Sequence, residues 1–364
     1  MTRREFISQT ALASAGALAG GCAATRMAGP NDLCWGVLLH LGSNMWADWS
    51  PLKKYAKSAE EAEKMRESLA EFKGKPLFRK NGSYRIVRGD YLAADIPTWN
   101  ALTEQMGKEG LNLVLIDVGE AYCYPSHPEL WVNGGFSPDR MRAELKRLRG
   151  LGLEPIPKLN FSAGHDQWLR QYHYMTSTRK YYQVVADLIK DVCEVFDNPR
   201  YFHLGFDEET TAAVKDRQMA VLRQGDLWWH DFNFCVAEVE KHGARATMSA
   251  DYAWEHKDEY FRKMSKRVLQ GNWYYGAEFD PSKMEHPEYV TTYDELEKHG
   301  FDQFAGCSNI GNPVNIPGTV KYCREHVSSE HLKGFQASIW RCTCPQYDET
   351  HYNAIDLLTD AVKA

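Results

Sequence analysis

Short apolar runs alternate with longer amphipathic segments along most of the chain, starting at Leu33. Apolar runs of this length with few polar interruptions predict parallel strands that are covered on both faces. The predicted strands are Leu33–Leu41, Leu111–Val118, Leu153–Leu159, Tyr201–Phe206, Ala244–Ala250, Val268–Trp273, Gln303–Cys307 and Gly334–Trp340. The intervening segments predict helices, most clearly between Tyr181 and Val192, where apolar residues form one stripe at helical spacing.

Glycines mark the joins between predicted helices and the strands that follow them, at Gly110, Gly152, Gly243, Gly300 and Gly334. Glycine readily takes the left-handed conformation that ends many helices. Eight strands with repeated joins of this kind predict an α/β fold, a single (β/α)8 TIM barrel. An open doubly wound sheet is the alternative, but no glycine-rich phosphate loop follows the first strand.

A long insertion interrupts this pattern after strand 1, at about residues 43–95. It is far longer than an ordinary connection between a strand and a helix. Because it follows the first strand, it should lie at the carboxyl end of the barrel, where the active sites of such barrels lie. We expect either a lid or wall for a substrate, or a structural insertion.

The first 30 residues predict export. Arg3 and Arg4 are followed by Phe6 and a weakly apolar run, as in a twin-arginine signal, and the run is too short to span a membrane. It ends at Cys22 in a segment similar to a lipoprotein cleavage box. We expect residues 1–30 to be signal and linker, 31–364 to be the barrel, and the protein to be periplasmic or attached to a membrane or the cell surface through a lipid on Cys22.

Composition narrows the functional classes. The 364 residues carry a net charge of −6, so the composition does not predict the basic surface by which proteins bind nucleic acid. The 11 tryptophans and 19 tyrosines include enough aromatic rings for stacking on sugars. The cysteines other than Cys22 show no zinc-ligand spacing, so we expect buried apolar fillers, no metal and no cofactor.

Three acids follow the fourth strand directly, at Asp207, Glu208 and Glu209. Neighbouring carboxylates raise one another's pKa, which suits a general acid. The alternative is that such acids cap the next helix, which fits Glu209 best. Further polar and aromatic candidates follow the other predicted strands, namely His165, Asp251, Trp273, Tyr274, Tyr275, Trp340 and Arg341.

These residues resemble the motifs of glycoside hydrolase family 20, the β-N-acetylhexosaminidases. His203-x-Gly205-x-Asp207-Glu208 is similar to the family's signature at strand four. The segment from Ile156 to His165 resembles its strand-three motif, and the last predicted strand ends in Trp340, as the family's closing strand does.

The resemblance implies a barrel enzyme that binds a carbohydrate and uses the substrate's own acetamido oxygen as the nucleophile. Glu208 would be the general acid and base, and Asp207 would orient the acetamido group. His165 and His203 would support the carboxylates by hydrogen bonds. The remaining expected substrate contacts are Trp273 and Trp340 as pocket walls, Tyr274 or Tyr275 as a donor to the acetamido oxygen, and Asp251 by position.

The chain departs from the family's pattern at several positions. Trp35-Gly36-Val37 stands where the family has a sugar-binding arginine, and Lys158 and Asn160 replace an acidic pair. Arg341 follows Trp340 where an acid is usual. One hypothesis is therefore an anionic substrate met by Lys158 or Arg341, and the other is that both side chains point away.

Other functions stay open at this stage. A glycosidase with a conventional carboxylate pair could act on a sugar without an acetamido group, with Glu208 as the acid. Its second carboxylate would be drawn from Asp251, Glu255, Glu278 or Asp280. A non-catalytic surface protein that binds glycans is another candidate. A metal-dependent barrel enzyme has little support, because the sequence shows no spacing of residues that is typical of metal ligands. The oligomeric state is not indicated.

Overall fold

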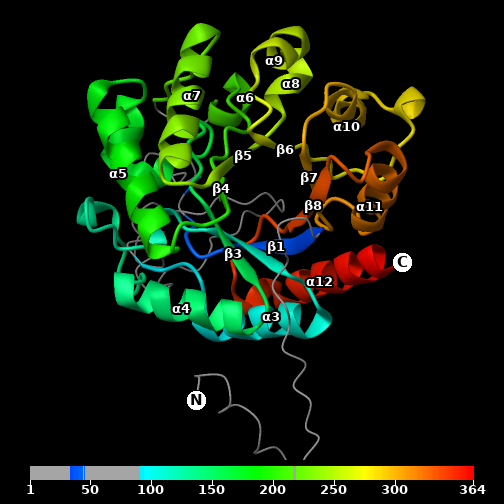
Figure 1. Cartoon of the computed structure of the whole chain (residues 1–364). Coiled ribbons are helices and arrows are strands. Elements are labelled where there is room, and N and C mark those ends of the chain that lie inside the picture. Colours follow the sequence, from blue (N-terminus) through cyan, green and yellow to red (C-terminus); the bar gives the residue numbers. More distant parts are fainter. Residues whose placement is uncertain (1–32, 44, 46–90, 216–218) are drawn as a thin grey trace, which may run out of the picture.

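The computed structural model describes residues 33–43, 45, 91–215 and 219–364. Eight parallel strands close a barrel in the order β1 to β8, and helices surround it (Figure 1). The strands are β1 (Cys34–His40), β2 (Leu113–Asp117), β3 (Glu154–Lys158), β4 (Tyr201–His203), β5 (Arg245–Ser249), β6 (Leu269–Gly271), β7 (Gln303–Cys307) and β8 (Leu332–Ser338). The helices are α3 (Ile96–Glu109), α4 (Pro138–Gly150), α5 (Arg179–Val195), α6 (Thr211–Val214), α7 (Asp226–Lys241), α8 (Tyr252–Glu255), α9 (Lys257–Lys263), α10 (Glu288–Lys298), α11 (Asn315–His326) and α12 (Asp348–Lys363). The predicted TIM barrel is confirmed.

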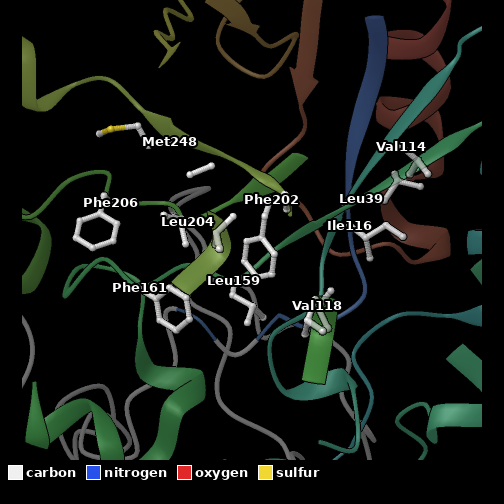
Figure 2. Close-up of a cluster of buried hydrophobic side chains, with 14 of the residues drawn as sticks. Leu39, Val114, Ile116, Val118, Leu159, Phe161, Phe202, Leu204, Phe206 and Met248 are labelled. Atoms are coloured by element: carbon white, nitrogen blue, oxygen red, sulfur yellow. The ribbon is translucent and has the colours of Figure 1, made fainter. Parts of the chain in front are cut away.

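Side chains of the strands alternate between the barrel interior and the helices, because successive residues of a strand point to opposite faces. Leu113 and Leu115 of β2 belong to a small cluster inside the barrel. Val114 and Ile116 belong to the large cluster between the sheet and the helices (Figure 2). Both faces of each strand are therefore apolar, which explains the uninterrupted runs in the sequence.

The interior face turns polar at the carboxyl ends of the first four strands. His40, Asp117, Lys158 and His203 lie side by side at one level of the barrel, each paired in register with the next. All four are nearly inaccessible to solvent. This polar layer forms the floor beneath the loops that follow the strands.

Local signals at the helix ends agree with the sequence pattern at most positions. The Ser137 side chain accepts a hydrogen bond from the Arg140 amide at the start of α4. Gly110, Gly152, Gly243 and Gly300 have positive φ angles where helices end. The prediction for Gly334 was wrong: it lies inside β8, where a Cβ would meet the carbonyl oxygen of Cys34 at 2.1 Å. Close approach of the backbones requires glycine there, not a helix end.

Most strands end earlier than the apolar pattern predicts, and the early ends of β4 and β6 matter most for the residues that follow. The chain leaves the sheet after His203, because Gly205 and Phe206 have φ angles of 75° and 64°. Strand β6 ends at Gly271, and Trp273 makes a single bridge to Gly306. Because both strands end early, the site residues that follow them lie outside the sheet. The apolar run in the sequence continues past the end of the strand in each case.

The predictions for the N-terminal segment and for most of the 43–95 insertion fall on residues outside those described. They stay predictions. Within the described part of the chain, no helix is long and apolar enough to cross a membrane. Of the cysteines described there, all except Cys123 are buried, in agreement with their expected role as apolar fillers.

Replacing Gly36 by alanine should destabilise the barrel. A Cβ at this position would lie 2.0 Å from the carbonyl oxygen of Leu113 on the neighbouring strand. Backbone must move to relieve such a contact, at a cost of about 1–3 kcal/mol or more in unfolding free energy. Gly150→Ala is the control, because nothing lies within 4 Å of that Cβ. Chemical denaturation should show a lower midpoint for Gly36→Ala alone, and equal midpoints would contradict the packing argument.

Candidate active site

The paired acids lie at the exit of β4, on a segment that the loop after β3 holds in place. Asn160 Nδ2 donates to Asp207 Oδ1 at 2.9 Å, and Ser162 Oγ donates to the backbone carbonyl of Asp207. Backbone hydrogen bonds join Leu159 and Phe161 to the same segment. Both ends of Asp207, side chain and backbone, are therefore fixed from one loop.

Gly205 makes this close approach possible. Its φ angle is 75°, and a Cβ there would lie 1.9 Å from Asn160 Oδ1. The Gly205 amide donates to His203 Nδ1 at 3.0 Å, which leaves the proton of the neutral ring on Nε2. Burial and the nearby Lys158 lower the pKa of His203 to about 3, so the ring is neutral. His203 thus shapes the turn, and in the described structure no hydrogen bond joins it to the carboxylates it was expected to support.

His165 bridges the two acids. Its Nε2 lies 3.3 Å from Asp207 Oδ2 and 3.1 Å from Glu208 Oε2. Burial alone would lower the pKa of His165, but the charge of Asp207 and hydrogen bonds to both carboxylates raise it to about 10. His165 is therefore a cation at neutral pH, and it is placed as the sequence predicted.

Asp251 holds the same segment from the side of β5. Its Oδ2 accepts the backbone N–H of Glu208 at 2.8 Å, and its Oδ1 accepts the indole N–H of Trp273 at 3.3 Å. Glu208 has a φ angle of 54°, a conformation that costs a non-glycine residue about 1–3 kcal/mol. Asp251 is one of the contacts that stabilise this strained position.

The two neighbouring aspartates, Asp207 and Asp251, carry different charges. Burial would raise the pKa of Asp207, but His165, Lys158 and the Asn160 hydrogen bond hold it well below its usual range. Burial and the negative charge of Asp207 raise the pKa of Asp251 to about 8. Asp207 is consequently ionised at neutral pH, whereas Asp251 retains its proton. Such divergence between neighbouring carboxyls is typical of catalytic sites.

A pocket of about 180 Å³ opens in front of Glu208, whose side chain is 48% exposed. The lining residues are His165, Asp207, Glu208, Trp273, Tyr275 and Trp340. Trp273 stacks on Tyr275 with ring centroids 5.0 Å apart. The indole N–H of Trp340 donates to Tyr275 Oη at 2.9 Å, which leaves the phenolic hydrogen available to donate into the pocket. Burial raises the pKa of Tyr275 well above its usual range, so the phenol is neutral.

A smaller cavity of about 20 Å³, room for roughly one water, continues below this pocket to Lys158 and His203. Lys158 is 1% exposed, its Nζ lies 3.6 Å from Asp117 Oδ2, and it lies 4.7 Å from the centre of a Trp340 ring. Lys158 therefore has a protein counter-ion and an aromatic cover, and the space beside it is too small for a substituent such as sulfate.

Several expected contacts lie elsewhere. Tyr274 is buried against Phe279 and does not line the pocket, because adjacent residues after β6 point in different directions. Arg341 does not line it either; its Nη1 donates to the carbonyl of Trp340. Of the two tyrosine candidates, Tyr275 is the one that lines the pocket, and for Arg341 the structure agrees with the alternative that its side chain points away. Asp251 lines an adjoining cavity.

Glu209 does not cap a helix, and its role was missed. It forms an ion pair with Arg223, which is 2% exposed and also donates to the Phe161 carbonyl at 2.6 Å. Glu209 Oε1 further accepts the amide of Ala163 at 3.0 Å. The helix cap is the next residue, Thr210, whose side chain accepts from Ala213. Glu209 therefore ties the loops after β3 and β4 together behind the acids. No sequence signal marked Arg223, which follows in a loop.

No family model matches the chain, and no curated protein matches it. Solved structures do. A family 20 exo-β-N-acetylglucosaminidase from Vibrio harveyi, in complex with N-acetylglucosamine, matches with a TM-score of 0.52 at 12% identity, over 73% of this chain and 52% of that one. An N-acetyl-β-hexosaminidase from Streptomyces plicatus in complex with Thio-NAglucal has a TM-score of 0.52 at 11% identity, over 72% and 60%. A family 20 β-N-acetylhexosaminidase from Streptomyces coelicolor A3(2) has a TM-score of 0.51 at 11% identity, over 71% and 61%.

The chain has the barrel fold of these hexosaminidases. At 11–12% identity the likeness is one of fold, and the chain spans between 52% and 61% of the length of those three proteins. In the ranges 33–43, 91–215 and 219–364, no three His, Cys, Asp or Glu side chains are grouped to hold a metal ion.

Because the pKa of Asp251 is raised, we expect the difference in stability between the wild type and Asp251→Asn to depend on pH. The pKa is raised from 3.8 to about 8, so the stabilising contribution of this group is fully present below about pH 4 and is lost as the pH rises to about 8. Asparagine keeps an acceptor for the Glu208 amide but does not ionise.

We expect the melting temperature of the wild type to fall relative to Asp251→Asn between pH 4 and pH 8, measured by calorimetry. Asp258→Asn, at an exposed position on α9, is the control and should show no such trend. Parallel curves for wild type and Asp251→Asn would mean that Asp251 ionises normally.

Proposed function

We propose that this chain is a glycoside hydrolase of the family 20 kind, acting on N-acetylhexosamine-type or related sugars with help from the substrate's acetamido group. The observation that carries the proposal is the arrangement around His165. A buried, ionised Asp207 and a half-exposed Glu208 share this cation and face one aromatic pocket.

The two acids suit different tasks. Glu208 is accessible, so it can give a proton to a glycosidic oxygen and later take one from water. Asp207 is fixed by Asn160 and His165, so it suits orienting an N–H group and stabilising positive charge near it. The aromatic walls at Trp273 and Trp340 suit the apolar faces of a sugar ring.

In the proposed reaction the acetamido oxygen attacks the anomeric carbon as Glu208 protonates the leaving oxygen. Asp207 accepts the acetamido N–H, and Tyr275 donates to the acetamido oxygen. Water then attacks the anomeric carbon and gives a proton to Glu208, while the bond between that carbon and the acetamido oxygen breaks; this releases the sugar with its acetamido group restored and leaves Glu208 protonated again. The acetamido group thereby serves as the nucleophile, so the protein supplies none.

The geometry gives less support to a conventional carboxylate pair. Among the residues described around the first pocket, the carboxyl groups are those of Asp207 and Glu208. Asp251 is protonated at neutral pH and lines the adjoining cavity. Glu278 Oε1 accepts the backbone N–H of Asp280 at 2.8 Å, and neither residue lines the pocket. The proposed sugar is also uncharged, because Lys158 is paired with Asp117 and Arg341 does not line the pocket.

We also infer that the protein is exported by the twin-arginine route, in the periplasm or anchored by a lipid on Cys22. This inference rests on Arg3, Arg4 and the segment ending at Cys22.

Glu208→Gln should remove hydrolysis of acetamido sugars. Loss of a general acid typically lowers the rate about 10²–10⁴-fold. The measurement is release of chromophore from aryl N-acetylglucosaminide and N-acetylgalactosaminide, compared with aryl glucoside, galactoside and glucuronide. Glu278→Gln is the control, because this exposed residue lies outside the pocket.

Cleavage confined to the two acetamido sugars supports the proposal. Cleavage of sugars without that group would favour a conventional pair of carboxylates. Absence of cleavage together with glycan binding would favour a non-catalytic glycan-binding protein, and the proposed activity would then be wrong.

Tyr275→Phe and Tyr274→Phe form a matched pair. A hydrogen bond to a charge-bearing group contributes about 1.5–3 kcal/mol, so removing the Tyr275 hydroxyl should lower kcat by about 10- to 10²-fold. Tyr274→Phe should change kcat by about twofold or less, because its ring packs against Phe279 outside the pocket. The measurement is the kcat and KM of each variant with an aryl N-acetylglucosaminide. A rise in KM alone for Tyr275→Phe would mean that Tyr275 merely holds Trp340.

A further inference from the structure

Arg223 is buried in a segment whose other residues face solvent. Its exposed fraction is 2%, whereas every other residue of the segment 219–227 is half-buried or exposed. Arginine is rarely buried to this degree unless its charge is paired. The burial of Arg223 therefore depends on the groups that its guanidinium contacts.

Two buried carboxylates contact this guanidinium. Arg223 Nε donates to Glu209 Oε2 at 3.1 Å and its Nη2 donates to Glu209 Oε1, so the pair is bidentate. On the other side, Nη1 lies 3.6 Å from Asp231 Oδ2. Asp231 belongs to α7 and accepts hydrogen bonds from Ser177 Oγ and Tyr182 Oη, both at 2.6 Å. The guanidinium is therefore held between a fixed carboxylate of α7 and Glu209.

Glu209 in turn holds the surroundings of the accessible acid. It directly follows Glu208, whose φ angle is 54°, and its Oε1 accepts the amide of Ala163 at 3.0 Å. The two loops touch beside this bond, because a Cβ on Gly164 would lie 2.8 Å from the Glu208 carbonyl oxygen. The next residue is His165, whose Nε2 lies 3.1 Å from Glu208 Oε2. One carboxylate therefore fixes both the loop of the acid and the loop of its histidine.

Arg223 also contacts the first part of the same turn. The guanidinium carbon lies 4.6 Å from the centre of the Phe206 ring, and Phe206 has a φ angle of 64°. Arg223 Nη2 donates to the Phe161 carbonyl at 2.6 Å. Residues other than glycine keep such φ angles only where the surrounding contacts impose them. Arg223 therefore supports the turn at both strained positions, at Phe206 directly and at Glu208 through Glu209.

We propose that Arg223 is a positioning residue of the proposed reaction: through Glu209 it holds the left-handed backbone of Glu208 and so keeps the Glu208 carboxyl within reach of the leaving oxygen. The inference rests on the proposed function, in which Glu208 protonates that oxygen. A general acid must lie within hydrogen-bond distance of the atom that it protonates. A misplacement of about 1 Å can lower a rate about 10²-fold.

The test compares Arg223→Lys with the control Arg200→Lys. Lysine keeps the positive charge but lacks the planar fork that bonds both oxygens of one carboxylate. Arg200 forms an equivalent bidentate pair with Glu154 where β3 and β4 begin, at the opposite end of the barrel from the pocket. The control therefore weakens an ion pair of the same kind without touching the loops of the site.

The measurement is kcat/KM for two aryl N-acetylglucosaminides, one that releases phenolate and one that releases dinitrophenolate. Phenolate needs a proton as the bond breaks, whereas dinitrophenolate is stable enough to leave without one. Arg223→Lys should lower kcat/KM about 10- to 10²-fold for the phenyl substrate and about twofold or less for the dinitrophenyl substrate. A smaller folded fraction would lower both values equally. Arg200→Lys should keep the wild-type ratio between the two substrates.

Glu209→Gln repeats the test from the other partner and decides it if Arg223→Lys does not fold. Glutamine keeps the length of the side chain but loses the charge that pairs with Arg223, so the same selective loss is expected. Equal losses on both substrates, or no loss, would overturn the positioning role while the proposed function stands. Absence of hydrolysis of either substrate by the wild type would overturn the proposed function and this inference with it.

Discussion

The ionised carboxylate of Asp207 lies almost out of reach of solvent, and the neighbouring charges are arranged around it. An isolated carboxylate in such a place would take up a proton instead of staying charged. His165 and Lys158 supply positive charge, and Asn160 supplies a hydrogen bond. Lys158 in turn is paired with Asp117, which also lies 3.2 Å from His40. The polar layer of the barrel is therefore linked to this buried charge through Lys158.

The same charge explains why Asp251 stays neutral. Two carboxylates close together in a poorly solvated site cannot both ionise easily. Asp207 has the cations, so Asp251 keeps the proton and acts as an acceptor for the Glu208 backbone. Asp207 thus fixes both the electrostatics of the site and, through Asp251, part of its geometry.

The sequence was sufficient for the barrel, because each strand buries both faces and leaves an uninterrupted apolar run. It was sufficient for Asp207, Glu208, His165, Trp273 and Trp340 as neighbours, because each follows a strand and the carboxyl ends of parallel strands meet. It was insufficient between Tyr274 and Tyr275, since the direction of a side chain in a loop depends on contacts such as that with Phe279. Arg223 could not be found, because its partners Glu209 and Phe161 come from two other loops.

The four residues of the signature have two kinds of role. They are His203, Gly205, Asp207 and Glu208. His203 and Gly205 hold the backbone: one accepts the amide of the other, and the absent side chain of Gly205 admits Asn160. Asp207 and Glu208 are the two acids of the proposed reaction. A distant barrel that keeps the histidine and glycine but has lost the acids would preserve the turn without the reaction. The first half of such a signature therefore reports on the turn, and the second half reports on the proposed reaction.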